Sequence, residues 1–172
     1  MTFIVESFDK RIHLRDSFDC GNDALNSYIQ RQASQDLKRK IAALFVMTAE
    51  SNSEVIAYYT LSMFSAGLTD LQPALAKRLP RYPKLPATLL GRLAVDRQHK
   101  GRGLGGYLLV DALKRALDVS SQVGTLAVVA EAIDENAVTF YRKYGFESFQ
   151  SNPQKLYLSM KSIQALRQKV DF

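Results

Sequence analysis

Hydrophobic and polar positions recur along the first third of the chain with the periods of strands and of one helix. Residues 3–8 alternate apolar and polar side chains, the two-residue period of a strand. Residues 24–40 carry apolar side chains three and four positions apart, which predicts a helix with one buried face. Residues 41–48 and 55–63 are β-rich apolar runs on either side of a polar turn, so we expect an antiparallel hairpin.

The remainder of the chain alternates between strand and helix patterns after a proline-rich segment. Residues 64–87 contain four prolines, so we expect mostly loop there, with a short helix near residues 75–78. The predicted elements that follow are a strand over 88–95, a helix over 103–119, a strand covered on both faces over 124–132, a helix over 134–144 stopped by Gly145, a strand over 155–160 and a tail of helical composition. This order predicts an α/β fold with a mixed sheet.

Length and composition limit the class of protein. A chain of 172 residues with 47% hydrophobic residues fits one globular domain over residues 1–172. Its single cysteine, Cys20, excludes a disulfide scaffold and favours a reduced, cytoplasmic setting. The longest wholly apolar run, residues 41–47, is far shorter than the roughly 20 residues of a membrane-spanning helix. No leader-peptide pattern is visible at the N-terminus, so we expect a soluble cytoplasmic protein with no membrane partner.

Charge is distributed unevenly and indicates an anionic partner. The net charge is +6, yet residues 75–115 hold ten basic and two acidic side chains and therefore carry +8. Such an imbalance favours a phosphate-bearing cofactor, a nucleic acid, or both. A basic surface without a nucleic-acid role stays open as the alternative.

The most informative stretch runs from Leu90 to Gly105. Its part from Gln98 to Gly105, between a predicted strand and a predicted helix, is called the glycine turn below. Its glycines at 101, 103 and 105 let backbone N–H groups point into one concavity at the positive end of the helix dipole. Lys100 and Arg102 add positive charge at the rim. This combination predicts a site for a pyrophosphate.

Three readings of the glycine turn can be compared on the residues alone. A nucleoside-triphosphate loop needs Gly-Lys-Ser/Thr at its end, but here Leu104 follows Gly103. A dinucleotide fingerprint would use Glu131 as its acidic residue, but the turn comes too late in the chain for the usual half-sheet. A β–α turn without a ligand is the third reading.

Two motifs resemble those of the GNAT N-acetyltransferases. Gln98-x-x-Gly101-x-Gly103 resembles the family's pyrophosphate turn, and Asn136-x-x-x-FYRKYGF resembles its C-terminal helix. The resemblance covers nearly the whole chain and implies a GNAT fold, an α/β domain whose mixed, mostly antiparallel central sheet is flanked by helices. It also implies acetyl-coenzyme A as the cofactor, with these binding residues: Leu93, Ala94, Val95, Gln98, Lys100, Gly101, Arg102, Gly103, Leu104, Gly105, Asn136 and Phe140.

The same resemblance places a general acid at Tyr141. A phenol with a pKa of about 10 can protonate a departing thiolate and be restored from solvent. A packing role stays open, because Phe140, Tyr144 and Phe146 crowd the same segment, and we expect Tyr144 to pack.

No strong general base is visible in the sequence. Glu131 and Asp134 follow a predicted strand and could reach an amine, although Asp134 is more typical of a helix N-cap. An α-amine has a pKa of about 7.7–8.0, against about 10.4 for lysine, so the missing base favours an α-amine substrate. We expect His99 in a solvated loop, His13 at the surface and no metal, since no Cys/His cluster has ligand spacing.

Further segments resemble one subgroup, the GNAT toxins of bacterial toxin–antitoxin pairs. They are residues 18–26 (FDCGNDALN), 58–62 (YYTLS), 79–83 (LPRYP) and 89–96 (LLGRLAVD). The resemblance implies acetylation of the α-amine of aminoacyl-tRNA, a block of translation, neutralisation by a ribbon-helix-helix antitoxin, and a homodimer. The candidate tRNA contacts are basic residues of the +8 segment, namely Lys77, Arg78, Arg81, Lys84 and Arg92.

Two other functions stay open at this point. One is a GNAT enzyme acting on a small amine or a protein N-terminus, for which the basic residues would be a solvated face. The other is a non-catalytic GNAT-like domain that binds coenzyme A.

Overall fold

The computed structural model of the protein describes residues 2–169, which form two compact units. The first unit contains the residues up to 62 together with 92–112, and the second contains 63–91 and the residues from 113 onward. Strands β3 (Ala57–Gly67) and β4 (Lys84–Val95) and helix α4 (Leu104–Val119) contribute residues to both units. One domain over residues 1–172 stays a prediction.

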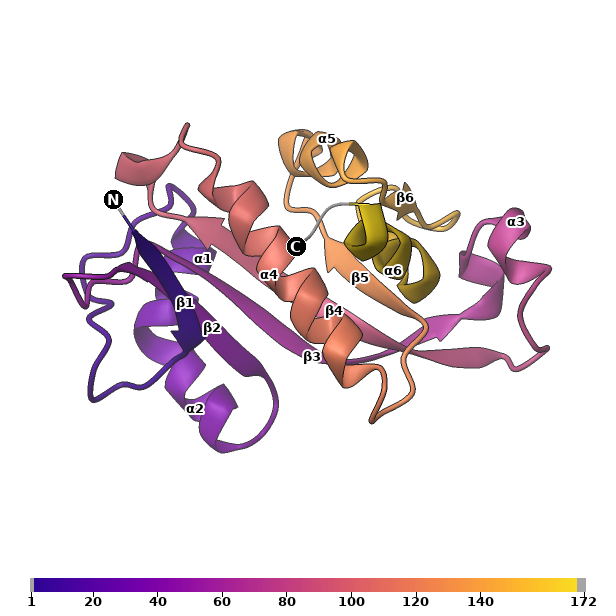
Figure 1. Cartoon of the computed structure of the whole chain (residues 1–172), viewed down its shortest axis with the longest axis horizontal. Helices are drawn as coiled ribbons and strands as arrows, with labels where there is room; N and C mark the ends of the chain where they lie inside the picture. Colours follow the sequence, from indigo (N-terminus) through magenta and orange to yellow (C-terminus); the bar gives the residue numbers. More distant parts are fainter. Residues whose placement is uncertain (1, 170–172) are drawn as a thin grey trace. The chain divides into compact units, whose positions relative to one another are not determined.

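The first unit combines antiparallel strands with a long helical segment (Figure 1). Its further elements are β1 (Phe3–Ser7), α1 (Asp23–Ser27), the π-helical segment η1 (Tyr28–Gln32), α2 (Ala33–Lys38), β2 (Ala43–Ala49) and the 3₁₀ turn η3 (Arg97–His99). β1 runs antiparallel to β2, and β2 runs antiparallel to β3. The predicted first strand, helix and hairpin are confirmed.

The helical segment of the first unit begins where the sequence supplies a capping residue. Asn22 has an extended backbone, and its side-chain oxygen accepts the Leu25 N–H at 3.0 Å. α1, η1 and α2 then follow without a break, because the residues between them keep helical backbone angles. Apolar periodicity predicted the helix but not its central π-helical turn.

The second unit holds the remaining strands and three helices. Its further elements are the 3₁₀ turn η2 (Leu68–Asp70), α3 (Pro73–Ala76), β5 (Ala127–Glu131), α5 (Glu135–Lys143), β6 (Glu147–Ser148), β7 (Lys155–Ser159) and α6 (Met160–Lys169). β5 pairs in parallel with β4 and antiparallel with β7, which also pairs with β6. The seven strands have the order β1-β2-β3-β4-β5-β7-β6, so the predicted mixed, mostly antiparallel sheet is confirmed.

Each unit has its own apolar core. In the first, Phe18, Ile29 and Tyr58 are at most 1% exposed and pack among the helical segment and the strands. In the second, Ala87 and Val129 lie on neighbouring strands and are fully buried. The burial of every residue from 127 to 130 confirms that this strand is covered on both faces.

The proline-rich segment is more regular than predicted. β3 continues to Gly67 and β4 already begins at Lys84, so only the part between them is loop, with its short helix at Pro73–Ala76 rather than at 75–78. Pro86 is tolerated inside β4 because the pairing with β5 starts after it, at Thr88, and its carbonyl accepts the Leu126 N–H. The two-residue strand β6 was not predicted.

The expectation that His13 lies at the surface is wrong. His13 is only 4% exposed, and its Nδ1 accepts the Asp9 N–H at 2.9 Å. Its other ring nitrogen lies 2.8 Å from Glu6 Oε1 and donates to that carboxylate, since Nδ1 is already an acceptor. His13 thus closes the loop after β1, in a segment that has no hydrophobic period to predict burial.

The C-terminal tail is helical as predicted up to Lys169. The prediction for residues 170–172 lies outside the described residues. Within residues 2–169, no helix combines the length and the apolar character needed to cross a membrane.

Candidate functional site

The glycine turn follows β4 directly and leads into α4. Gly101 and Gly103 have φ angles of +83° and +75°, which glycine adopts at little cost and other residues rarely adopt. A Cβ built at either position would meet nothing within 4 Å, so the space above the turn is open. Buried Leu104 then fixes the first turn of α4. The predicted strand, turn and helix are confirmed.

The start of α4 presents free backbone donors. The first intrahelical bond runs from the Tyr107 N–H to the Gly103 carbonyl. Nothing in residues 2–169 accepts the N–H groups of residues 103–106, and no side chain caps them. Four free N–H groups at the positive end of a 16-residue helix form a site for an anion. The turn therefore fits a pyrophosphate.

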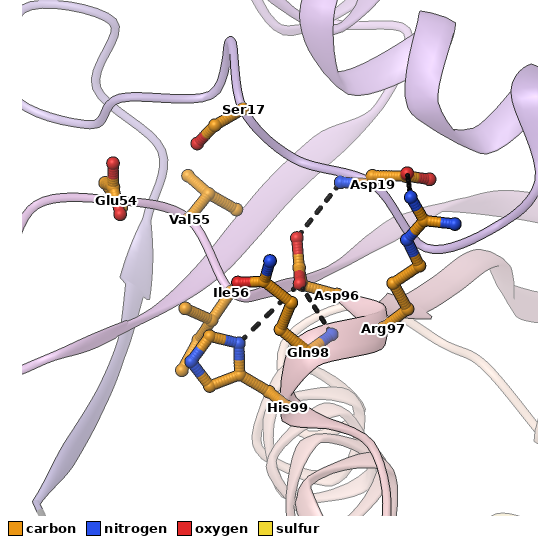
Figure 2. Close-up of a pocket in the computed structure, with 9 residues that line it drawn as sticks. All are labelled: Ser17, Asp19, Glu54, Val55, Ile56, Asp96, Arg97, Gln98 and His99. Carbon is orange, nitrogen blue, oxygen red and sulfur yellow. Dashed lines mark hydrogen bonds and ion pairs between the residues drawn. The ribbon is translucent and has the colours of Figure 1, made fainter.

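Asp96 attaches the glycine turn to the loop before α1 (Figure 2). This residue is 8% exposed, and its two carboxylate oxygens accept the backbone N–H groups of Asp19 (3.0 Å) and Gln98 (2.9 Å). Arg97 strengthens the junction, because its N–H donates to the Asp19 carbonyl and its guanidinium pairs with the Asp19 carboxylate, both at 2.9 Å. The Gly21 N–H, followed by the Asn26 amide, lowers the pKa of Asp19 below its ordinary value and keeps the ion pair charged.

His99 borders a polar pocket of about 380 Å³ beside this junction, together with Ser17 and Glu54. The prediction of a solvated histidine is only partly correct, because its side chain is 25% exposed. Its Nδ1 is buried and lies 3.7 Å from Asp96 Oδ1, beyond hydrogen-bond distance. His99 ends the 3₁₀ turn that Asp96 caps, and this position accounts for its partial burial.

The two cations predicted at the rim differ in what they contact. Lys100 donates from Nζ to the Cys20 carbonyl at 2.9 Å, so it also fixes the loop before α1. Arg102 is exposed and has no acidic partner among residues 2–169. Arg102 is therefore the cation of the turn that is available to a ligand, whereas Lys100 is already engaged.

Tyr141, Asn136 and Phe140 lie in the second unit, on α5. Tyr141 is 4% exposed and packs against the rings of Phe140 and Phe146, with centroids 5.2 and 5.3 Å away. Burial raises the pKa of its phenol, so the hydroxyl stays protonated at neutral pH. No other described residue hydrogen-bonds that hydroxyl. Tyr144 packs on Phe140 as predicted, and Asn136 is exposed in the first turn.

The two candidate bases have different surroundings. Asp134 is the N-cap of α5, as its position predicted, and its carboxylate accepts the Ala137 N–H at 2.8 Å. Glu131 is exposed at the end of β5. Within residues 2–169 no group of three or more His, Cys, Asp or Glu side chains could hold a metal ion.

The predicted tRNA contacts fall into two groups. Four of them are exposed in the second unit, have no acidic partner among residues 2–169, and are Lys77, Arg78, Arg81 and Lys84. Arg92 is different, because it is half-buried in the first unit and its guanidinium carbon lies 3.5 Å from the centre of the Tyr28 ring. Neither Tyr28 nor Asp96 was singled out from the sequence. An aspartate directly after a strand and two residues before a turn was the available signal for Asp96.

A mixed sheet whose strand β4 leads into a glycine-rich helix start lined by free N–H groups is typical of proteins that bind the phosphates of a nucleotide or cofactor. An acetyltransferase (GNAT) domain model matches residues 42–148. The chain belongs to the GNAT acetyltransferase family, and its cofactor is acetyl-coenzyme A.

Similar proteins are bacterial toxins. The chain is 28% identical to "Probable toxin TacT" of Sinorhizobium fredii, over 95% of this chain and 94% of that protein. It is 32% identical to a "tRNA-acetylating toxin" of Mycobacterium tuberculosis, over 87% and 88% of the two chains. A solved structure, "AtaT complexed with acetyl-methionyl-tRNAfMet", superposes with a TM-score of 0.89 at 30% identity, over 96% of this chain and 99% of that one. AtaT has also been solved bound to the C-terminus of the antitoxin AtaR.

The Asp96 junction gives a first testable expectation. Asp96→Ala removes the carboxylate that holds two backbone N–H groups, so we expect the free energy of unfolding to fall by about 2 kcal/mol. The glycine turn would lose its attachment, and binding of acetyl-coenzyme A should weaken with it. Urea denaturation and titration calorimetry measure the two effects.

Asp118→Asn is the matched control for that experiment. Asp118 is an exposed carboxylate that pairs with Arg167 at 3.0 Å, and exposed pairs contribute little. Equal losses of stability in the two variants, or unchanged cofactor affinity in Asp96→Ala, would show that Asp96 does not hold the turn.

Proposed function

We propose that the protein transfers the acetyl group of acetyl-coenzyme A to the α-amine of aminoacyl-tRNA and so blocks translation. The observation that carries this proposal is the similarity, over almost the whole chain, to AtaT complexed with acetyl-methionyl-tRNAfMet. The 32% sequence identity to the tRNA-acetylating toxin of M. tuberculosis also supports it. The exposed basic side chains of the second unit suit a polyanionic substrate.

In this proposal the glycine turn holds the phosphates of the cofactor. The free N–H groups of residues 103–106 and the Arg102 guanidinium take the pyrophosphate, and Gln98, Lys100 and Gly101 complete the turn. Backbone groups of Leu93, Ala94 and Val95 line up the rest of the cofactor, with Asn136 and Phe140 alongside. When bound, acetyl-coenzyme A supplies the acetyl group as a thioester.

Tyr141 is the general acid of the proposed reaction. The amine nitrogen forms a bond to the acetyl carbon and releases one proton to solvent, the carbon–sulfur bond breaks, and the Tyr141 hydroxyl gives its proton to the thiolate and regains one from solvent. Burial raises the pKa of the Tyr141 phenol, so the hydroxyl carries its proton at neutral pH and has it available to donate.

A strong base is not required for this substrate. The α-amine of an aminoacyl ester is partly neutral at pH 7, since α-amines have pKa values of about 7.7–8.0. Asp134 is engaged as a helix cap, which leaves exposed Glu131 as the available carboxylate near that strand end.

The proposed partners follow from the same relatives. AtaT binds an antitoxin, and by analogy we propose an antitoxin of the ribbon-helix-helix type for this chain. We also propose that this chain acts as a homodimer. Because aminoacyl-tRNA is a cytoplasmic substrate, the proposed place of action is the cytoplasm.

The proposal is tested by supplying labelled acetyl-coenzyme A with bulk aminoacyl-tRNA, uncharged tRNA, free amino acids and a peptide with a free N-terminus. Label on aminoacyl-tRNA alone is the expected result. Label on free amino acids or on the peptide would replace the proposal with a GNAT acting on a small amine or a protein N-terminus. Cofactor binding without any transfer would indicate a non-catalytic domain.

A further inference from the structure

Arg92 is a half-buried cation, and no acidic side chain among residues 2–169 pairs with it. It lies on β4, directly before the cofactor strand residues, and its side chain is half-buried. Its guanidinium carbon is 3.5 Å from the centre of the Tyr28 ring, a close cation–π contact. No acceptor in residues 2–169 hydrogen-bonds the guanidinium. Its five N–H donors are therefore unused in a partly desolvated place, where an uncompensated charge is costly.

Asp36, the carboxylate that holds the Tyr28 hydroxyl, accepts two hydrogen bonds from other residues. The Tyr28 hydroxyl donates to Asp36 Oδ2 at 3.0 Å, and the Gln32 side-chain amide donates to Asp36 Oδ1 at 3.1 Å. Burial, and then the bond to Asp36, raise the pKa of Tyr28 to about 12, so the ring stays neutral and its face keeps its attraction for a cation. Asp36 thus fixes the ring under Arg92 instead of pairing with Arg92.

The π-helical turn brings the Tyr28 and Asp36 side chains to the same face of the helical segment. Tyr28 and Asp36 are eight residues apart, which in a regular α-helix of 3.6 residues per turn is about 2.2 turns and offsets their side chains by about 80°. The segment Tyr28–Gln32 has the wider i→i+5 bonding, so the same eight residues span about two turns and the side chains meet. A π-helical turn of this kind is rare and is often found at functional sites.

We infer that Tyr28 and Asp36 are positioning residues that hold the Arg92 guanidinium as a preformed site for a phosphate oxyanion, and that a phosphodiester of the aminoacyl-tRNA occupies it. This inference rests on the proposed function for the source of the phosphate. A flat guanidinium with free, planar donors matches phosphate geometry and loses little freedom on binding. A phosphate of the cofactor is the other source of the same chemistry, and the experiment separates the two.

The test compares Arg92→Gln, Arg92→Lys, Tyr28→Phe and Tyr28→Leu, with Arg31→Gln as the control. Arg31 is an exposed arginine of the same π-helical segment, so its loss removes the same charge without touching the ring. Each variant is assayed with aminoacyl-tRNA, with a phosphate-free aminoacyl-adenosine, and by calorimetry with acetyl-coenzyme A. Binding of uncharged tRNA is measured over a range of salt concentrations.

We expect Arg92→Gln to raise the KM for aminoacyl-tRNA about tenfold or more. The salt dependence of tRNA binding should become less steep by about 0.7–0.9 in the logarithmic slope, one phosphate contact. The turnover of aminoacyl-adenosine and the affinity for acetyl-coenzyme A should not change. Arg92→Lys keeps the charge but not the planar guanidinium, so its KM for aminoacyl-tRNA should lie between those of the wild type and Arg92→Gln. Tyr28→Leu should raise this KM as much as Arg92→Gln does. Tyr28→Phe should raise it less than Tyr28→Leu.

An unchanged salt slope in Arg92→Gln overturns the inference, and so does an equal loss with aminoacyl-adenosine, which would indicate a structural role. Weaker binding of acetyl-coenzyme A in Arg92→Gln would assign the phosphate to the cofactor and overturn the RNA assignment. If Tyr28→Leu does not fold, Tyr28→Phe and Arg92→Lys still decide the matter. Wild-type protein that does not acetylate aminoacyl-tRNA would overturn the proposed function alone, and the salt slopes would still test Arg92.

Discussion

Tyr141→Phe should lower kcat about 10²–10⁴-fold, the usual contribution of a positioned general acid. Phenylalanine keeps the contacts of the ring with Phe140 and Phe146 but has no proton to give to the departing thiolate. The KM for acetyl-coenzyme A should change little, because the proposed role concerns the transition state and not cofactor binding. Steady-state kinetics with both substrates measure this split.

Tyr144→Phe is the matched control on the same segment. Tyr144 packs on Phe140 with centroids 5.3 Å apart, so loss of its hydroxyl should leave kcat unchanged. A fall in kcat of the same size in both variants, or a full rate in Tyr141→Phe, would remove Tyr141 from the mechanism.

The pH dependence follows from the direction of the Tyr141 shift. The pKa in the folded state is above the unfolded value of about 10. The folded protein therefore binds this proton more tightly, and the related stabilisation is fully present below pH 10 and decreases as the pH rises above it. Accordingly, deprotonation of Tyr141 should impose no alkaline fall in kcat below about pH 10.

The second large effect is expected at the exposed basic residues of the second unit. Replacing Lys77, Arg78, Arg81 and Lys84 together by alanine should lower kcat/KM for aminoacyl-tRNA about 10²-fold at moderate salt, because several phosphate contacts are lost. The dependence of log K on log salt concentration should become less steep by about 3. Aminoacyl-adenosine should be acetylated at the wild-type rate, since it presents no phosphates.

A matched charge deletion exists in the first unit. Lys10, Arg31, Lys38 and Arg39 are equally exposed, so their replacement removes the same charge from a different part of the chain. If both sets lower tRNA acetylation equally, the effect is that of net charge and the four residues form no specific contact surface.

The fold could be predicted largely because its elements carry regular apolar periods and clear end signals. Asn22 caps α1, Asp134 caps α5 as its position predicted, and Gly145, with a φ of +95°, ends α5 where a left-handed residue is needed. The limits of β3 and β4 were not predictable from the prolines, since a proline is compatible with a strand wherever no partner strand needs its N–H.

The parts of the candidate site that depend on local backbone conformation could be predicted from the sequence. The parts that depend on contacts between residues distant in the sequence could not. The glycines at 101 and 103 have a local reason, their positive φ, and the sequence shows it. Asp96 contacts Asp19, 77 positions away, and Arg92 lies against the ring of Tyr28, which begins a π-helical turn. Contacts of this kind have no period or motif, so the sequence does not indicate which distant residue is the partner.

The most direct test of the proposed activity is the identity of the acetylated atom. Aminoacyl-tRNA is incubated with the protein and acetyl-coenzyme A, digested with nuclease, and the terminal aminoacyl-adenosine is analysed by tandem mass spectrometry. The account predicts one added acetyl group on the α-nitrogen of the amino acid, formed at least about 10²-fold more slowly by the Tyr141→Phe protein under the same conditions. An acetyl group on a base, or only unmodified aminoacyl-adenosine after incubation with the wild-type protein, would contradict it.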